Sequence, residues 1–230
     1  MRLSPLPADQ WDDAARHAVS GMLPEERRNP RDAGNVLSTL VRHPKLTRAY
    51  LRFSSYLLYG STLPPRIREQ VILRVAHRRG CAYEWSHHVD IGKDVGLSDA
   101  DIEAVQSGNP SDEFDRAVLG AVDELDEKTN ILDQTWAALG ERLDERQRMD
   151  LIFTIGGYIA LAMALNTFGV EVEKDHGRPE RSEQVDALLA VAGRALKALR
   201  GPRNATGPKR PCGKRSGTGT SGTSWRPSAG

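Results

Sequence analysis

Residues 64–97 constrain the fold of this chain most strongly, because they predict two helices joined by a tight turn. Pro64 and Pro65 suit a helix start, since their fixed φ is helical and an N–H is not needed there. Apolar residues then recur at three- and four-residue spacing, which makes one stripe of a helix: Ile67, Val71, Ile72 and Val75. Gly80 follows a basic turn, as a glycine that ends a helix often does. A second helix is expected from about Cys81 to Val95.

Residues that can carry chemistry gather on this second helix. Cys81, Glu84 and His88 stand at i, i+3 and i+7, so they share one face over two turns. Glu69 lies about three turns before Gly80, and His88 lies about two turns after it, at ~1.5 Å per residue. An antiparallel hairpin therefore places the two at similar depth. We predict that Glu69, Cys81, Glu84 and His88 line one pocket between the helices and form the catalytic set.

Three further residues are candidates for binding a substrate. Tyr83 and Trp85 are expected near the wall of this pocket, and Arg66 is expected to hold a substrate carboxylate. Each pattern also has a structural interpretation. A Glu and a His four residues apart are commonly a solvated pair on a helix surface, and helix-surface arginines are commonly solvated as well. A single cysteine is commonly a small buried apolar residue.

The rest of the chain up to about residue 175 also has helical periodicity, and no segment alternates at period two, so the sequence predicts an all-α fold. Residues 21–32 are expected to be a loop. The longest apolar stretch, 143–168, contains Asp150 and Gly156-Gly157, which favours a central core helix over a membrane span. The helices expected outside the hairpin cover 8–20, 34–42, 44–59, a short one after Ser98, 111–128, 133–139 and 143–168.

The last part of the chain differs from the rest in charge and composition. Nine of the 32 Lys and Arg residues and none of the 31 Asp and Glu residues lie in 194–230, so residues 1–193 carry a net charge of −8. We predict one domain over 1–175, a possible extra helix over 176–200, and a disordered basic tail over 201–230. The two cysteines, Cys81 and Cys212, form no disulfide framework, and the N-terminus lacks the apolar core of a signal peptide, which indicates a cytoplasmic protein without a membrane partner.

The hairpin motif resembles a known family. Glu69 is followed twelve positions later by Cys81-Ala82-Tyr83-Glu84-Trp85-Ser86-His87-His88. This resembles the carboxymuconolactone decarboxylase family, whose fold is shared with the AhpD alkylhydroperoxidases. The decarboxylase-like branch has the pattern Tyr-Glu-Trp-x-x-His, and the peroxidase branch has Cys-x-x-Cys-x-x-x-His. Two later runs also look like family landmarks, Gly96-Leu97-Ser98-Asp99 and Asn166-Thr167-Phe168-Gly169-Val170, and the resemblance covers roughly residues 30–175.

The resemblance implies an oligomeric AhpD-like helical bundle, a trimer or hexamer, that acts on a small molecule. Aligned to the peroxidase pattern, Cys81 takes the first cysteine position and Glu84 the second, so one thiol of the redox pair is absent. By similarity, Glu69 and His88 would form a proton relay near Cys81. The chain is therefore expected to be a decarboxylase-like lyase that acts on a small organic acid or lactone by acid–base chemistry.

Two alternatives of other classes stay open. One is a thiol peroxidase, an oxidoreductase with peroxiredoxin activity that uses Cys81 with an external reductant. The other is a non-catalytic oligomeric helical protein. We expect no cofactor, no specific nucleic-acid partner and no metal, because the Glu, His and Cys side chains lack any familiar metal-ligand spacing.

Overall fold

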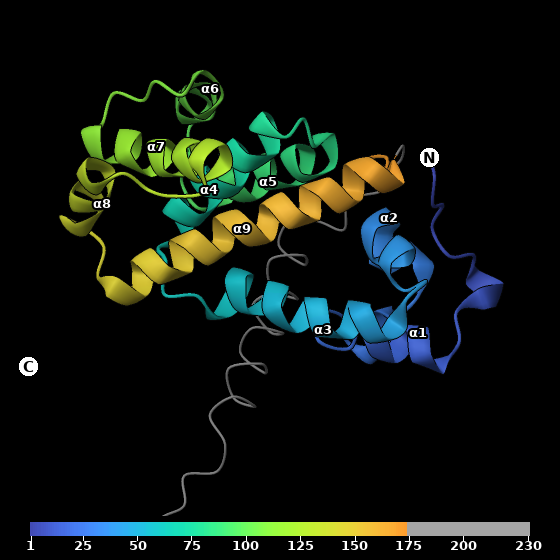
Figure 1. Ribbon diagram of the computed structural model, residues 1–230. Helices are drawn as coiled ribbons and strands as arrows, with labels where there is room; N and C mark the ends of the chain where they lie inside the picture. The colour runs from blue at the N-terminus through green and yellow to red at the C-terminus, as the bar shows by residue number, and fades with distance from the viewer. Residues whose placement is uncertain (174–230) are drawn as a thin grey trace, which may run out of the picture. The chain divides into compact units, whose positions relative to one another are not determined.

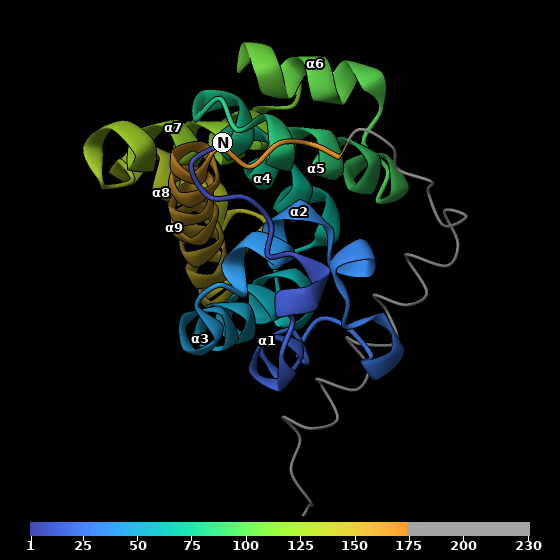
Figure 2. The ribbon, with the colours of Figure 1, turned by 90° about the vertical axis from the view of Figure 1, so that its right-hand side faces the viewer.

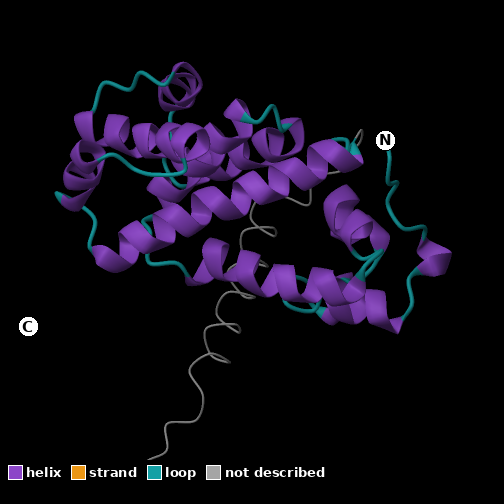
Figure 3. Cartoon of the chain, viewed as in Figure 1, coloured by secondary structure: helices purple, strands orange, loops and turns teal. Residues whose placement is uncertain are grey.

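The computed structural model describes residues 1–173, and within them the chain is helical, with no strand (Figures 1 and 3). The prediction of an all-α fold is confirmed. The α-helices are α1 (Asp13–Ala18), α2 (Pro30–Leu40), α3 (Pro44–Ser55), α4 (Pro65–Arg78), α5 (Ala82–Asp94), α6 (Asp99–Ser107), α7 (Glu113–Lys128), α8 (Asp133–Gly140) and α9 (Glu145–Phe168). Short 3-10 turns cover Ala8–Gln10 and Glu25–Arg27, and a π-helical turn, η3, covers Tyr56–Gly60.

Helix α4 is the centre of the main core. It packs against α5, α7 and α9, and α9 crosses close to it in Figure 1. All residues from Glu69 to Ala76 of α4 are buried, so this helix is covered on every side along that stretch. Its apolar stripe meets aliphatic residues of α7 and α9, among them Val118, Val122, Leu151 and Ile155. Burial on all sides keeps α4 rigid, and any side chain that it directs toward α5 is held in a fixed place.

The first helices form a smaller cluster. Trp11, Ala15 and Val19 of the α1 region pack with Val41 and Leu51, so α1 lies against α3. The N-terminal segment lies beside the end of α9 (Figure 2), where the backbone N–H of Arg2 donates to the carbonyl of Phe168 at 2.7 Å. These elements therefore cover one side of the hairpin and of α9.

The predicted boundaries were wrong in three places. The helix expected over 8–20 covers only Asp13–Ala18, because Asp12 caps it by accepting from the backbone N–H of Ala15. The loop expected over 21–32 ends earlier, since α2 begins at Pro30. The helix expected over 44–59 stops at Ser55 and continues as the π turn.

A buried carboxylate accompanies this π turn. Asp150 of α9 accepts from the hydroxyl of Tyr56 at 2.8 Å and from the backbone N–H of Thr62 at 2.6 Å. These hydrogen bonds join both ends of the segment 56–62 to α9. The segment is thus held by a residue that lies 94 positions after Tyr56 and 88 positions after Thr62, which local spacing does not reveal.

Helix α9 is the one helix among residues 1–173 that is long and apolar enough to cross a membrane by length and composition. Core helices of globular proteins pass the same test. Helix α9 packs against α4 and buries Asp150 and Thr154, as a core helix does. The end of the predicted domain, the possible helix over 176–200 and the tail over 201–230 lie outside the described residues.

Candidate active site

The turn between α4 and α5 sets the geometry of the hairpin. Gly80 has φ +57°, a left-handed conformation that suits glycine, and the N–H of Cys81 donates back to the carbonyl of Ala76 at 2.9 Å. Helix α5 then starts at Ala82 and packs against α4 along its length. The turn therefore directs one face of α5 toward Glu69.

Glu69 and His88 meet between the two helices. Nδ1 of His88 lies 2.6 Å from Oε2 of Glu69, whose side chain is fully buried, and Nε of Arg68 donates to Oε1 at 2.9 Å. Burial raises the pKa of Glu69, but the charges and hydrogen bonds of His88 and Arg68 outweigh it and hold that pKa below its usual value. Glu69 is therefore a carboxylate that accepts from Nδ1–H, and Nε2 of His88 is left for a substrate.

Glu84 lies one turn before His88 and is also buried, with 2% of its surface exposed. Neither of its carboxyl oxygens has a hydrogen-bond partner among the described residues. Burial raises the pKa of Glu84 to about 7, and the nearby His88 and Cys81 offset part of that effect. At neutral pH this carboxyl is therefore present in both the protonated and the ionised form, as a general acid requires.

Cys81 is buried at the start of α5, close to Glu84 but without a hydrogen bond of normal geometry to it. Burial, with the charge of Glu84, raises the pKa of the thiol to about 12. The thiol is therefore protonated at neutral pH, whereas the nucleophilic form is the thiolate. Cys81 faces a shallow depression of about 300 Å³ that it shares with His77, Trp85 and Gln106.

A cavity of about 250 Å³ lies beside His88 and Glu84. Residues from α2, α3, α5 and α9 line it together with Met22 and Leu58, and most are aliphatic, such as Leu37, Leu51 and Leu161. Its lining polar or aromatic residues are Tyr50, Ser54, Tyr83, Glu84, His87, His88 and Tyr158. Of the four residues predicted to line one pocket, Glu84 and His88 line this cavity. Glu69 lies behind His88, and Cys81 is not part of the lining.

Tyrosines complete the cavity wall around the two site residues. The ring of Tyr158 meets His88 edge to face, with centroids 5.2 Å apart. Burial raises the pKa of Tyr50 and of Tyr158, and the negative charge of Glu84 raises both further, so both phenols keep their protons. Neither tyrosine could be assigned to the site from the sequence, because Tyr50 and Tyr158 lie far from residues 64–97 along the chain and their spacing indicates only a helical core.

Tyr83 forms one wall of the cavity and is held in place from two sides. Its ring stacks on His87 with centroids 4.2 Å apart, and its hydroxyl donates to Glu173 at 2.9 Å. The same carboxylate accepts from the backbone N–H of Asn35 at 2.7 Å, directly after Gly34, which has φ +64°. The segment after α9 is therefore tied to α2 and α5 at the cavity wall.

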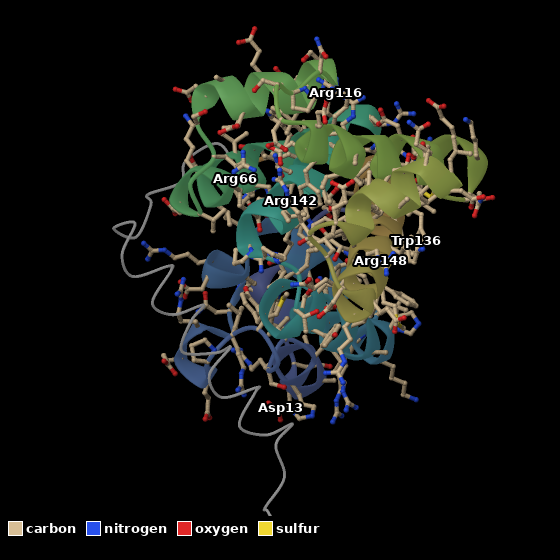
Figure 4. The ribbon with its side chains drawn as sticks, turned by 90° about the vertical axis from the view of Figure 1, so that its left-hand side faces the viewer. Asp13, Arg66, Arg116, Trp136, Arg142 and Arg148 are labelled. Carbon is tan, nitrogen blue, oxygen red and sulfur yellow. The ribbon has the colours of Figure 1, made fainter. Side chains whose placement is uncertain are left out.

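Trp85 and Arg66 lie elsewhere. Trp85 packs against the apolar cluster that contains Leu73 and faces the Cys81 depression. Arg66 (Figure 4) is held between Asp101 of α6 and Asp115 of α7 by ion pairs of 3.0 Å each. Neither residue lines the cavity, because each is engaged on another side of its helix. Within residues 1–173, no three His, Cys, Asp or Glu side chains lie close enough together to hold a metal ion.

The model of the carboxymuconolactone decarboxylase family matches residues 44–127, which include α3, α4 and α5. No curated protein matches the chain.

Solved structures share the fold. A protein of unknown function from Agrobacterium tumefaciens, titled a putative antioxidant defence protein AhpD, is 21% identical, with a TM-score of 0.53 over 58% of this chain and 94% of its own. An uncharacterised peroxidase-related protein with an AhpD core, from Ralstonia eutropha JMP134, is 17% identical, with a TM-score of 0.59 over 76% and 94% of the two chains. The debrominase Bmp8 is 16% identical, with a TM-score of 0.60 over 84% and 97%.

The match covers the two helices that hold Glu69, Glu84 and His88, and the structural neighbours have the same helical arrangement. Residues 44–127 thus match the model of the carboxymuconolactone decarboxylase family, and the described part of the chain has the AhpD-like fold.

Proposed function

We propose that this protein is an acid–base enzyme of the carboxymuconolactone decarboxylase type that acts on a small organic acid or lactone. The observation that carries the proposal is the pairing of His88 with the buried Glu69 beside an apolar cavity that Glu84 also lines. Glu69 orients the imidazole and keeps Nδ1 as the donor, so Nε2 is available to exchange a proton with the substrate.

The chemistry that fits these residues is proton transfer at a carbon next to a carbonyl group. Loss of CO2, or removal of a proton, from such a carbon leaves an enolate, or a dienolate where the substrate has a β,γ double bond, and this anion must be protonated at carbon. His88 is the group placed to deliver that proton. A protonated Glu84 can donate a hydrogen bond to the oxygen where negative charge develops.

A thiol peroxidase is the second candidate, and the titles of the structural neighbours favour it: one names an antioxidant defence protein and two others a peroxidase-related protein. Cys81 argues against it here. Its thiol is buried and protonated at neutral pH, and a glutamate stands where the resolving thiol would be.

Single substitutions distinguish these functions. We expect His88→Gln to abolish turnover of lactone acids or lactones, Glu69→Gln to reduce it about 10²-fold or more, and Cys81→Ser to leave it nearly unchanged. The matched controls are His17→Gln at an exposed histidine and Cys212→Ser at the second cysteine. If Cys81→Ser is the most damaging of the three and organic hydroperoxides are reduced by the wild type, the thiol function replaces the acid–base function. If neither activity is present in the wild type, the non-catalytic alternative is supported.

A further inference from the structure

Within residues 1–173, the cavity beside His88 offers neither lysine nor arginine to a bound anion, and its two histidines already face carboxylates, His88 with Glu69 at 2.6 Å and His87 with Glu173 at 3.6 Å. None of its lining residues among the described part of the chain is a lysine or an arginine. Three arginines of α4 are already paired with carboxylates of this chain. Arg68 is bonded to Glu69, Arg66 is held by Asp101 and Asp115, and Arg74 pairs with Asp123 at 2.7 Å.

The cavity instead presents acidic groups in apolar surroundings. Glu84 lines it directly, and the carboxylate of Glu69 stands behind His88. A ligand carboxylate placed here would lose its water among leucine, valine and alanine side chains without a lysine or arginine to compensate, and it would compete with Glu69 and Glu173 for the two histidines. Both effects disfavour binding of an anion.

Within residues 1–173, Glu84 also lacks a hydrogen-bond partner, which a ligand can supply. Both of its carboxyl oxygens are buried and have no hydrogen-bond partner among the described residues, and an unsatisfied buried polar group is costly. A protonated carboxyl satisfies this need by donating to a carbonyl oxygen. The phenols of Tyr50 and Tyr158, which keep their protons, are further donors on the same wall.

We infer that the cavity takes an uncharged ligand, a small and mostly apolar ketone, ester or lactone, and that it discriminates against carboxylates. The inference rests on the proposed acid–base function and narrows its substrate class. The volume of about 250 Å³ lies below the roughly 300–1,000 Å³ of pockets for drug-sized ligands, so the ligand is correspondingly small.

The reaction class that follows is a double-bond shift that consumes no other reactant. Nε2 of His88 takes a proton from the carbon next to the carbonyl, and the C–H electron pair becomes a carbon–carbon double bond. The carbonyl π pair moves to oxygen, which accepts the hydrogen bond from Glu84. His88 then returns the proton to the far carbon of the conjugated system, and the carbonyl re-forms. Atoms and electrons balance, because substrate and product are isomers.

A matched pair of ligands tests the inference with the full-length protein. The neutral probe is a β,γ-unsaturated five-membered lactone with a methyl substituent, and its partner has a carboxymethyl group in place of the methyl group. We expect isothermal calorimetry at pH 7.5 to show the neutral lactone binding at least ten times more tightly. The difference should narrow toward pH 4.5, where a carboxylic acid becomes substantially neutral. Equal or tighter binding of the carboxylated lactone at pH 7.5 overturns the inference, and so does the absence of neutral-lactone binding up to millimolar concentration.

Glu84→Gln provides the variant arm. The amide removes the acidic group but keeps a hydrogen-bond donor, so we expect affinity for the neutral lactone to change less than about threefold while the carboxylated lactone gains affinity at pH 7.5. Glu103→Gln, the same replacement at an exposed residue of α6, is the control and should leave both affinities unchanged. An unchanged preference in Glu84→Gln would contradict the discrimination assigned to Glu84.

Proton exchange separates this inference from the proposed function. Turnover is followed by NMR in D2O, where an acid–base site exchanges the proton next to the carbonyl. If the neutral lactone binds without exchange, the ligand class stands and the acid–base function fails. If the carboxylated lactone binds more tightly and loses CO2, the acid–base function stands and the ligand class fails.

Discussion

At the scale of single residues, the buried carboxyl of Glu84 has a direct thermodynamic consequence. Its pKa is about 7 in the folded chain, against 4.5 as the ordinary value. Below about pH 4.5 the carboxyl of Glu84 is protonated in both the folded and the unfolded chain, so its ionisation does not lower the free energy of unfolding. As pH rises toward 7, the unfolded chain gains from ionisation and the folded chain does not, so stability falls by up to ~3 kcal/mol and then stays level.

We therefore expect Glu84→Gln to flatten the dependence of stability on pH. The quantity to compare is the free energy of unfolding of the variant minus that of the wild type. This difference should be more positive at pH 8 than at pH 4.5 by a few kcal/mol, because the amide never ionises. Urea unfolding at the two pH values measures this. Glu103→Gln, at an exposed position, should show no such trend. A constant difference between Glu84→Gln and wild type at both pH values would show that Glu84 titrates normally.

Glu69 is expected to behave in the opposite way. Although burial raises its pKa, the interactions with His88 and Arg68 bring it below 4.5, so its contribution to stability is present above about pH 4.5 and is lost as pH falls further. Glu69→Gln leaves the partly buried guanidinium of Arg68 and the buried imidazole of His88 without their anion, and we expect a loss of about 3 kcal/mol in the free energy of unfolding at pH 7.

The catalytic effect of Glu69 is distinguished from its effect on stability by the pH profile. A positioning role predicts that the residual activity of Glu69→Gln follows a shifted pH–rate curve, and that Glu69→Asp restores part of the activity. A variant that is merely less stable would keep the wild-type pH dependence after correction for the folded fraction. That result would remove Glu69 from the proton relay.

At the scale of elements, the hairpin was predictable because its signals are local. The stripe of α4, the glycine at position 80 and the i, i+3, i+7 spacing on α5 all lie within about 25 residues, and helix rise alone placed Glu69 and His88 at similar depth. Nothing local shows which distant helices cover that site. Tyr50, Tyr158 and Glu173 reach it from elements whose packing depends on the whole core.

The ion pairs of Arg66 could likewise not be predicted from the sequence around it. In the sequence it is a cation one turn before Glu69. In the structure its charge is taken up by Asp101 and Asp115, which lie 35 and 49 residues further along the chain. Spacing along one helix predicts which face a residue occupies. It does not predict which oppositely charged groups another helix brings to that face.

Adjacent glycines of α9 give a matched test of how closely that helix packs. An added Cβ at Gly157 would lie 2.7 Å from Cδ1 of Leu57 and 3.1 Å from Cε1 of Phe53, whereas nothing lies within 4 Å of a Cβ at Gly156. We expect Gly157→Ala to destabilise the fold by about 1–3 kcal/mol through overpacking. Gly156→Ala should stabilise the monomer by up to ~1 kcal/mol through helix propensity. Thermal unfolding of both variants measures the contrast, and equal shifts would mean that α9 does not approach Leu57 so closely.

At the scale of the whole molecule, an apolar stripe remains exposed along α9. Met149, Phe153 and Met163 are each more than half exposed, at 57%, 55% and 54%. Phe53 of α3 extends the stripe, since its ring meets that of Phe153 edge to face at 6.3 Å. Large contiguous apolar surfaces of this kind commonly mark interfaces between proteins.

We propose that this stripe contacts further copies of the same chain, in a trimer or an assembly of trimers. Phe153 stands near its centre, so Phe153→Glu would place a charge in the buried part of each contact, where an unpaired charge is strongly unfavourable. Sedimentation velocity at micromolar concentration should show an oligomer for the wild type and a shift to monomer for Phe153→Glu. Leu132→Glu, at an exposed leucine before α8 that is outside the stripe, should sediment as the wild type does. A monomeric wild type, or an oligomer that Phe153→Glu leaves intact, would show that copies of the chain do not meet through α9.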